Sequence, residues 1–162
     1  MRVPWAYRAK AHDPMIAIDT NILVYASVES SPNHAAALCA LEGLALSGSA
    51  WGVPYPCAHE FLAITTNQRI YADHLSASEA FEVLEVMNKN RNFRWIGLGP
   101  MHLETLKTLV LGSGASAAAI HDARIAACCT DAGAHELWSA DSRAFPDCAC
   151  AIHWWLNGAE KV

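Results

Sequence analysis

The sequence predicts a single α/β domain, a three-layer α/β/α sandwich around a central, mainly parallel sheet. Short apolar runs alternate with longer segments whose apolar residues recur at helical spacing, a pattern typical of parallel strands joined by crossover helices. The chain has 162 residues, enough for one well-buried core. Its apolar fraction of 53% lies slightly above the roughly 45–50% of ordinary domains, as expected for a sheet covered on both faces.

The first part of the chain holds two predicted strands and three predicted helices. Each strand is a short apolar run, and the second helix repeats Leu38, Leu41 and Ala45 on one face. Prolines open the third helix, where they fit a first turn but not a helix interior. The strands are expected at residues 15–18 and 51–53, and the helices from about residue 21, over 33–46, and from 54–56 onward.

The second part alternates in the same way. Ser76 and Glu79 have the spacing of a capping box and open a helix. The segment 112–116 lacks the spacing and the lysine of a phosphate-binding loop, so it is interpreted as a helix end followed by a new helix start. Helices are predicted over 76–88, 100–111 and 117–132, and strands over 93–98, 136–140 and 149–154.

The first fourteen residues differ from the rest. Basic residues and prolines alternate there without a clear period, and a clean strand begins at Met15. We therefore expect an N-terminal extension over residues 1–14 and one domain over residues 15–162, with the hypothesis that Met15 is the native start.

Charge and hydropathy narrow the functional classes. The net charge of −5 argues against broad electrostatic capture of nucleic acid, so any such contact has to be local and metal-assisted. No apolar run approaches the ~18 residues of a membrane helix, and the N-terminus lacks the pattern of a secretory signal. A soluble, cytoplasmic protein without a membrane partner is expected.

The six cysteines form no CxxC pair and no repeating framework. Most are therefore expected to be small core residues. Cys148, Cys150 and His153 resemble metal ligands in type but have no evident fourth partner, so packing is the favoured interpretation for them as well.

Two acidic residues follow predicted strands directly. Asp19 comes after the run 15–18, and Asp141 ends the strand 136–140. The carboxyl ends of parallel strands are where open α/β sheets bind ligands, so both acids are candidate site residues. The alternative for Asp19 is a structural helix cap, a role that aspartate fills equally well.

Two further acids lie on predicted helices among apolar neighbours. Glu60 shares a helical face with Ile64, although a position at the rim of the core would also explain it. Asp122 is flanked at helical spacing by Ala118, Ile125, Ala126 and Cys129. Because aspartate is a poor residue inside a helix and is rarely buried unpaired, a functional role is favoured for Asp122.

These four carboxylates require a cation if they converge. Ionised carboxylates taken out of water are costly when unpaired, and a cluster of them raises the pKa of each member by repulsion. Oxygen-only ligand sets favour Mg²⁺ or Mn²⁺ over zinc. The sequence therefore predicts a metal site formed by Asp19, Glu60, Asp122 and Asp141.

Four segments together resemble the PIN-domain proteins, particularly the VapC-type toxins of bacterial toxin–antitoxin pairs. The segment 16–26, which contains Asp-Thr-Asn, resembles the opening of that family, and His59-Glu60-Phe61 matches its middle acid. Residues 121–127 followed by Gly133 resemble its later helix, and residues 137–141 its late strand and acid. In this order the motifs span nearly all of residues 15–150.

The resemblance implies a PIN-like fold and metal-dependent RNA cleavage. The four acids would hold Mg²⁺ or Mn²⁺, with Asn21 and Ser139 as polar supports beside them. It also implies a cognate antitoxin and a homodimer. Many family members carry another aspartate shortly before a phenylalanine, whereas Ser142, Arg143 and Ala144 precede Phe145 here, which leaves the number of metal ions open.

Positive charge for an RNA backbone has to come from few residues. Arg91 and Arg94, interleaved with Phe93 and Trp95, could contact phosphates and stack on bases. The alternative there is a helix end followed by a core strand. Arg143, two residues after Asp141, is the favoured phosphate contact.

Other functional classes fit less well. A phosphoacceptor domain requires a lysine at a late strand end, and a dehalogenase-like phosphatase requires an aspartate where Asn21 stands. Two alternatives to a toxin ribonuclease stay open: a PIN-like module that binds RNA or an antitoxin without turnover, and a housekeeping RNA-processing nuclease.

Overall fold

The computed structural model describes residues 14–141, 144–145 and 151–154, so the predicted extension lies outside the described residues except for Pro14. Five strands in this part form one sheet in the order β3-β2-β1-β4-β5, and every pair of neighbours is parallel. This confirms the predicted sheet and places the first strand at its centre. The strands are β1 (Met15–Ile18), β2 (Ala50–Pro54), β3 (Phe93–Ile96), β4 (Ala134–Ser139) and β5 (Ala151–Trp154).

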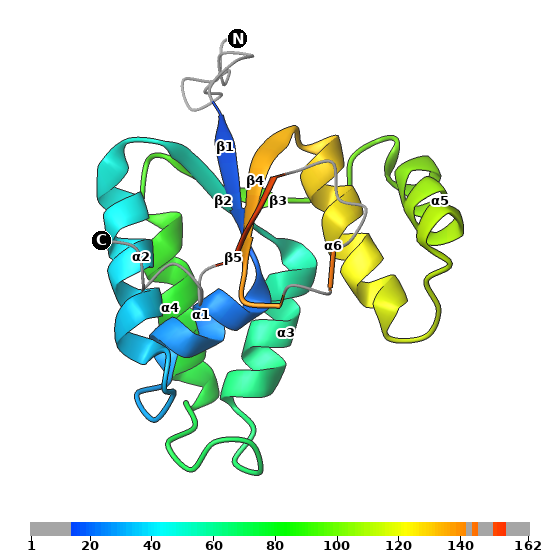
Figure 1. Cartoon of the computed structure of the whole chain (residues 1–162). Coiled ribbons are helices and arrows are strands. Elements are labelled where there is room, and N and C mark those ends of the chain that lie inside the picture. The colour runs from blue at the N-terminus through cyan, green and yellow to red at the C-terminus, as the bar shows by residue number, and fades with distance from the viewer. Residues whose placement is uncertain (1–13, 142–143, 146–150, 155–162) are drawn as a thin grey trace, which may run out of the picture.

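Helices cover the sheet as the alternation of patterns predicted. Figure 1 shows α2 and α4 on one side of the strands, α5 and α6 on the other, and α1 and α3 continuing beyond the ends of β1 and β2. None of the helices in the described ranges is long and apolar enough to span a membrane. Their bounds are α1 (Thr20–Ser27), α2 (His34–Ser47), α3 (Tyr55–Thr65), α4 (Ala77–Asn88), α5 (His102–Ser113) and α6 (Ala119–Asp131).

The predicted capping box at the start of α4 is present. The Ser76 hydroxyl accepts a hydrogen bond from the backbone N–H of Glu79, and the Glu79 carboxylate accepts one from the backbone N–H of Ser76. Together these bonds satisfy two donors that a helix start would otherwise leave unpaired. The cap therefore fixes the first turn of α4.

The start of α6 differs from the prediction in a way that matters for Asp122. The helix begins at Ala119, so Asp122 lies in its first turn rather than in its interior. A carboxylate in a first turn is favoured by the helix dipole and needs no functional explanation of its own. The expectation of Asp122 inside the helix was therefore wrong, and what distinguishes this residue is its position on the acidic cavity.

The core lies between the sheet and its helices. Ile18, Leu23, Val53 and Phe61 are fully or almost fully buried there. The expectation for the cysteines is confirmed for three of the four described ones, because Cys57, Cys128 and Cys129 are buried whereas Cys39 is exposed. Cys148 and Cys150, and the side chain of His153, lie outside the described residues.

Gly52 offers a test of the strand arrangement. It lies in β2 between Ala17 of β1 and Arg94 of β3, and an added Cβ would collide with the backbone carbonyl of Arg94. Because a backbone oxygen in a paired strand cannot move aside, Gly52→Ala is expected to lower the free energy of unfolding by about 2–3 kcal/mol in urea titrations.

The matched control is Gly43→Ala in α2, where a Cβ would have no neighbouring atom within 4 Å in the described structure. That change should raise stability by about 0.5–1 kcal/mol because alanine is the better helix former. Equal stability of the two variants would contradict the pairing of β2 with β3.

Candidate active site

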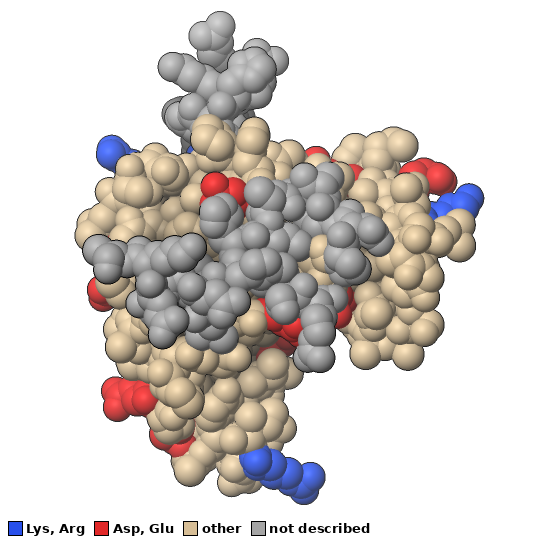
Figure 2. Space-filling model, viewed as in Figure 1, with Lys and Arg blue, Asp and Glu red and all other residues tan. Residues whose placement is uncertain are grey.

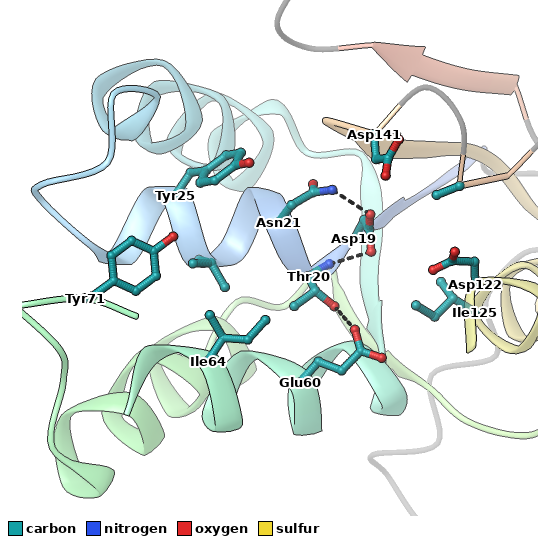
Figure 3. Close-up of a pocket in the computed structure, with 12 residues that line it drawn as sticks. Asp19, Thr20, Asn21, Tyr25, Glu60, Ile64, Tyr71, Asp122, Ile125 and Asp141 are labelled. Carbon is teal, nitrogen blue, oxygen red and sulfur yellow. Dashed lines mark hydrogen bonds between the residues drawn. The ribbon is translucent and has the colours of Figure 1, made fainter. Parts of the chain in front are cut away.

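The four predicted acids line one cavity of about 270 Å³. Asp19 follows β1, Asp141 follows β4, Glu60 lies in α3 and Asp122 in α6. Figure 3 shows the four side chains around a common space at the carboxyl ends of the central strands. The structure thus brings together residues that lie far apart in the sequence.

Asp19 is the most buried of the four, with 5% of its surface exposed. Its Oδ1 accepts a hydrogen bond from the backbone N–H of Thr20 at 2.7 Å, which caps α1. Its Oδ2 accepts hydrogen bonds from the Ser139 hydroxyl at 2.6 Å and from the Asn21 amide at 2.9 Å. The two interpretations of Asp19 are therefore compatible, because the residue caps the helix and also lines the cavity.

Asn21 and Ser139 join the ends of β1 and β4. The Asn21 amide donates to the Ser139 hydroxyl at 3.1 Å, and its oxygen accepts from the backbone N–H of Ala140 at 3.0 Å. The Ser139 hydroxyl also accepts from the backbone N–H of Asp141 at 3.1 Å. These contacts fix where the chain leaves β4, and they hold Asp141 near Asp19.

Burial and mutual repulsion act on the acids. Burial raises the pKa of Asp19 to about 6, with repulsion from Glu60 and Asp122 adding to the effect, although the hydrogen bonds from Ser139 and Thr20 oppose it. The pKa of Asp122 is also raised, first by burial and then by the charges of Asp141 and Glu60. The carboxylates therefore interact electrostatically, and a cation between them would be stabilised.

Glu60 is held by two neighbours that sequence analysis did not identify. The Thr20 hydroxyl donates to Glu60 Oε2 at 2.9 Å, and Nη2 of Arg124 lies 3.5 Å from Glu60 Oε1. Both members of the ion pair are about one third exposed, so the pair contributes little to stability. Its effect is to fix the direction of the Glu60 side chain and to offset part of the local negative charge.

The donor set suits a hard divalent cation. Among the described residues no three His, Cys, Asp or Glu side chains lie close enough together to form a closed ligand group. The four carboxylates instead surround the cavity, with Glu60 turned toward Thr20 and Arg124. All of them offer oxygen, which Mg²⁺ and Mn²⁺ prefer, and their repulsion is what such a cation would relieve.

A thiol also lies beside the acids. Sγ of Cys57 is 3.8 Å from Oδ1 of Asp19, and burial together with the charge of Asp19 raises the pKa of the thiol well above its ordinary value. A thiol of this kind stays protonated and is neither a nucleophile nor a soft metal ligand. Cys57 therefore acts as a packing residue and a weak hydrogen-bond donor.

Two of the three predicted basic contacts, Arg91 and Arg94, do not line this cavity. Arg94 lies in the edge strand β3, and its Nη1 donates to the backbone carbonyls of Arg91 and Phe93. Arg91 precedes β3, at the amino end of a strand, whereas the acids lie at carboxyl ends. The burial of Phe93 matches the alternative of a core strand. Arg143 lies outside the described residues.

The surface view agrees with this distribution of charge. In Figure 2 one group of acidic atoms lies near the middle of the visible face and others lie at its periphery, while the visible Lys and Arg atoms all lie at the periphery. Tyr25 and Tyr71 also line the cavity, which no pattern in the sequence indicated.

The raised pKa of Asp19 predicts a pH-dependent stability. The contribution of the protonated Asp19 carboxyl group to the free energy of unfolding is complete below the ordinary pKa of 3.8. This contribution is lost as the pH rises toward about 6. In EDTA, Asp19→Asn should therefore gain about 1 kcal/mol in unfolding free energy relative to the unaltered protein between pH 5 and pH 8. Urea titrations at the two pH values measure this difference.

Asp73→Asn is the control for that experiment. Hydrogen bonds from Ser30 lower the pKa of Asp73, so this carboxylate stays ionised across the same interval and its substitution should have a constant effect. A constant effect for Asp19→Asn as well would contradict the burial of a strained carboxylate.

Comparison with known proteins identifies the family to which the chain belongs. The family model described as the PIN domain matches residues 16–149. The chain is 31% identical over 113 residues to ribonuclease VapC25 of Mycobacterium tuberculosis, and the match covers 70% of this chain and 80% of that protein.

Solved structures share the fold. VapBC2 of Rickettsia felis, bound to a DNA fragment from its promoter, is 15% identical with a TM-score of 0.60 and covers 86% of this chain and 97% of its own. VapC20 of Mycobacterium tuberculosis, a sarcin-ricin loop cleaving toxin, is 15% identical with a TM-score of 0.58 and covers 80% and 92%. At these identities the likeness concerns the fold alone. The family model and the relative at 31% identity show that the chain belongs to the PIN domain family, where it is similar to the VapC ribonucleases.

Proposed function

We propose that this protein is a metal-dependent endoribonuclease that hydrolyses RNA phosphodiester bonds as the toxin of a toxin–antitoxin pair. The observation that carries the proposal is the arrangement of Asp19, Glu60, Asp122 and Asp141 around one cavity at the carboxyl ends of β1 and β4. The similarity to proteins named VapC ribonucleases supports the choice of RNA as substrate.

Each side chain has a role that follows from its contacts. The four carboxylates would hold Mg²⁺ or Mn²⁺. Asn21 and Ser139 orient Asp19, and Thr20 orients Glu60. When bound, the cation would lower the pKa of a water molecule and offset the negative charge at the phosphate. Attack by water would leave a 5′-phosphate and a 3′-hydroxyl, and the RNA 2′-hydroxyl would not be needed as the nucleophile.

The partners in this proposal are an antitoxin and a second copy of the chain. The proposal of an antitoxin partner is supported by solved structures of similar fold that are toxin–antitoxin complexes, among them one from Klebsiella pneumoniae. A largely apolar groove of about 750 Å³ lined from α1, α2 and α4 could receive an amphipathic helix of such a partner. Since RNA is the proposed substrate, we place the activity in the cytoplasm.

RNA cleavage by the purified protein tests the proposal. Protein freed of any bound partner should cut labelled total RNA at discrete sites with Mg²⁺ or Mn²⁺ and not in EDTA. Asp19→Asn and Asp122→Asn should each lower the rate by about 100-fold or more, because each removes a ligand of the proposed metal site. Gel analysis of the products, with end-group mapping, measures both the rate and the chemistry.

Glu85→Gln is the matched control, since Glu85 is exposed on α4 and does not line the cavity. Its rate should equal that of the unaltered protein. Products ending in a 2′,3′-cyclic phosphate would contradict the water-driven route. A folded protein that binds RNA but does not cut it would favour the module without turnover.

Metal binding can also be followed without RNA. A cation that binds only the folded protein raises its stability by about 2.7 kcal/mol when present at 100 times its dissociation constant. Mn²⁺ should therefore raise the melting temperature of the unaltered protein and of Glu85→Gln, and should raise that of Asp122→Asn much less. Equal shifts for all three proteins would place the binding outside the acidic cavity.

A further inference from the structure

The cavity that holds the acids has a second, uncharged end. Val24, Tyr25, Ile64 and Tyr71 line it together with the four carboxylates. Figure 3 shows Tyr25 and Tyr71 at the same end of the cavity, across from Asp122 and Asp141. One continuous space therefore has an anionic end and an aromatic end.

The aromatic end is held in place from two sides. Tyr25 lies in α1, whose first turn is fixed by the contacts of Asp19. Tyr71 lies between α3 and α4, and its backbone N–H donates to the carbonyl of Asn67 at 3.2 Å. Two residues later, Asp73 accepts hydrogen bonds from the backbone N–H and the hydroxyl of Ser30, at 2.9 and 2.6 Å.

These bonds join the α3–α4 connection to the turn that follows α1. They help to hold Tyr71 at the same end of the cavity as Tyr25. Both tyrosines are only partly buried, so they keep aromatic surface on the cavity side while the rest packs against the core.

The dimensions and chemistry of the cavity match one nucleotide. Its volume of about 270 Å³ is close to the lower end of the roughly 300–1,000 Å³ of small-ligand sites. An unpaired nucleobase has a flat π-face and carries no charge, so it suits tyrosine rings and is not repelled by the acids. The phosphate of the same strand needs a cation and therefore belongs at the other end.

We propose that Tyr25 and Tyr71 form a base-binding subsite that takes one unpaired nucleobase of the RNA strand next to the phosphate at the carboxylates. The subsite rests on the proposed function, because it orients the same substrate. The rings supply stacking surface, which accepts any base, and the two hydroxyls supply donors and acceptors that can distinguish base edges.

A second aromatic surface serves as the internal comparison. Tyr55 stacks on Trp95 with ring centroids 5.4 Å apart, and Tyr55 is 48% exposed. Neither residue lines the cavity of the acids. If aromatic exposure alone were enough to bind a base, Tyr55 would serve as well as Tyr71.

The test combines a protein change with the deletion of a base. The probe is a short single-stranded RNA that spans a mapped cleavage site, prepared as a series in which each nucleotide in turn is abasic. Cleavage in Mn²⁺ gives kcat and KM for the unaltered protein, Tyr71→Leu, Tyr71→Phe and Tyr55→Leu. Circular dichroism and melting temperatures check that each variant is folded.

For the unaltered protein, one abasic position next to the cut should raise KM by about 10-fold with little change in kcat, since stacking holds substrate and transition state alike. Tyr71→Leu should raise KM for the complete RNA by a similar factor and lose sensitivity to that one position, because the two changes remove the same contact. Tyr71→Phe should keep the sensitivity, and Tyr55→Leu should behave as the unaltered protein. If Tyr71→Leu does not fold, the same cycle is run with Tyr25→Leu.

Several outcomes would overturn the subsite. If the effects of Tyr71→Leu and of every abasic position on KM were additive, the tyrosine ring would not contact any of the bases. Loss of sensitivity in Tyr55→Leu would place the base at the β3 edge. Both results require RNA cleavage by the unaltered protein, so they leave the proposed function standing, whereas an absence of cleavage would overturn the function and the subsite together.

Discussion

The buried carboxylate of Asp19 is the constraint on which the rest of the site depends. An ionised group with 5% exposure can be kept only if its oxygens are satisfied. The donors come from two places: Thr20 and Asn21 in the first turn of α1, and Ser139 at the end of β4. Because those donors must stay near Asp19, the ends of β1 and β4 stay together. The position of Asp141 follows from the same contacts, since its backbone N–H is bonded to the hydroxyl that serves Asp19.

Burial, with electrostatic repulsion added to it, explains why such an arrangement does not serve stability. Both effects raise the pKa of Asp19 and of Asp122, so the ionised cluster costs free energy in the folded protein, and Arg124 offsets only part of that charge from a partly exposed position. A fold under no other requirement would place neutral side chains there. The net charge of −5 is consistent with the proposed site, because attraction to RNA would have to arise locally, from the proposed cation in the cavity and from the proposed uncharged contacts beside it.

Sequence patterns predicted the order of strands and helices, the parallel sheet and the four acids, because apolar periodicity and strand-end position are local signals. Other features depend on side chains from distant segments. The hydroxyl of Thr20 contacts Glu60, forty positions away. Tyr71 lines the cavity in a connection that Asp73 joins to Ser30. Contacts between residues so far apart in the sequence cannot be predicted from residue spacing. Arg91 and Arg94 do not line the acidic cavity, and their place could not be predicted because composition indicates charge but not which edge of the sheet carries it.

The central claim is that these acids form a single cation site. Anomalous diffraction from crystals grown with Mn²⁺ tests it most directly, because the signal locates the ion independently of any assumption about the ligands. The account predicts a peak inside the cavity, at a direct coordination distance of about 2.1–2.2 Å from at least one oxygen of Asp19, Asp122 or Asp141. Manganese bound only elsewhere, with Asp19 still engaged by Ser139 and Asn21 and the cavity without a peak, would contradict it.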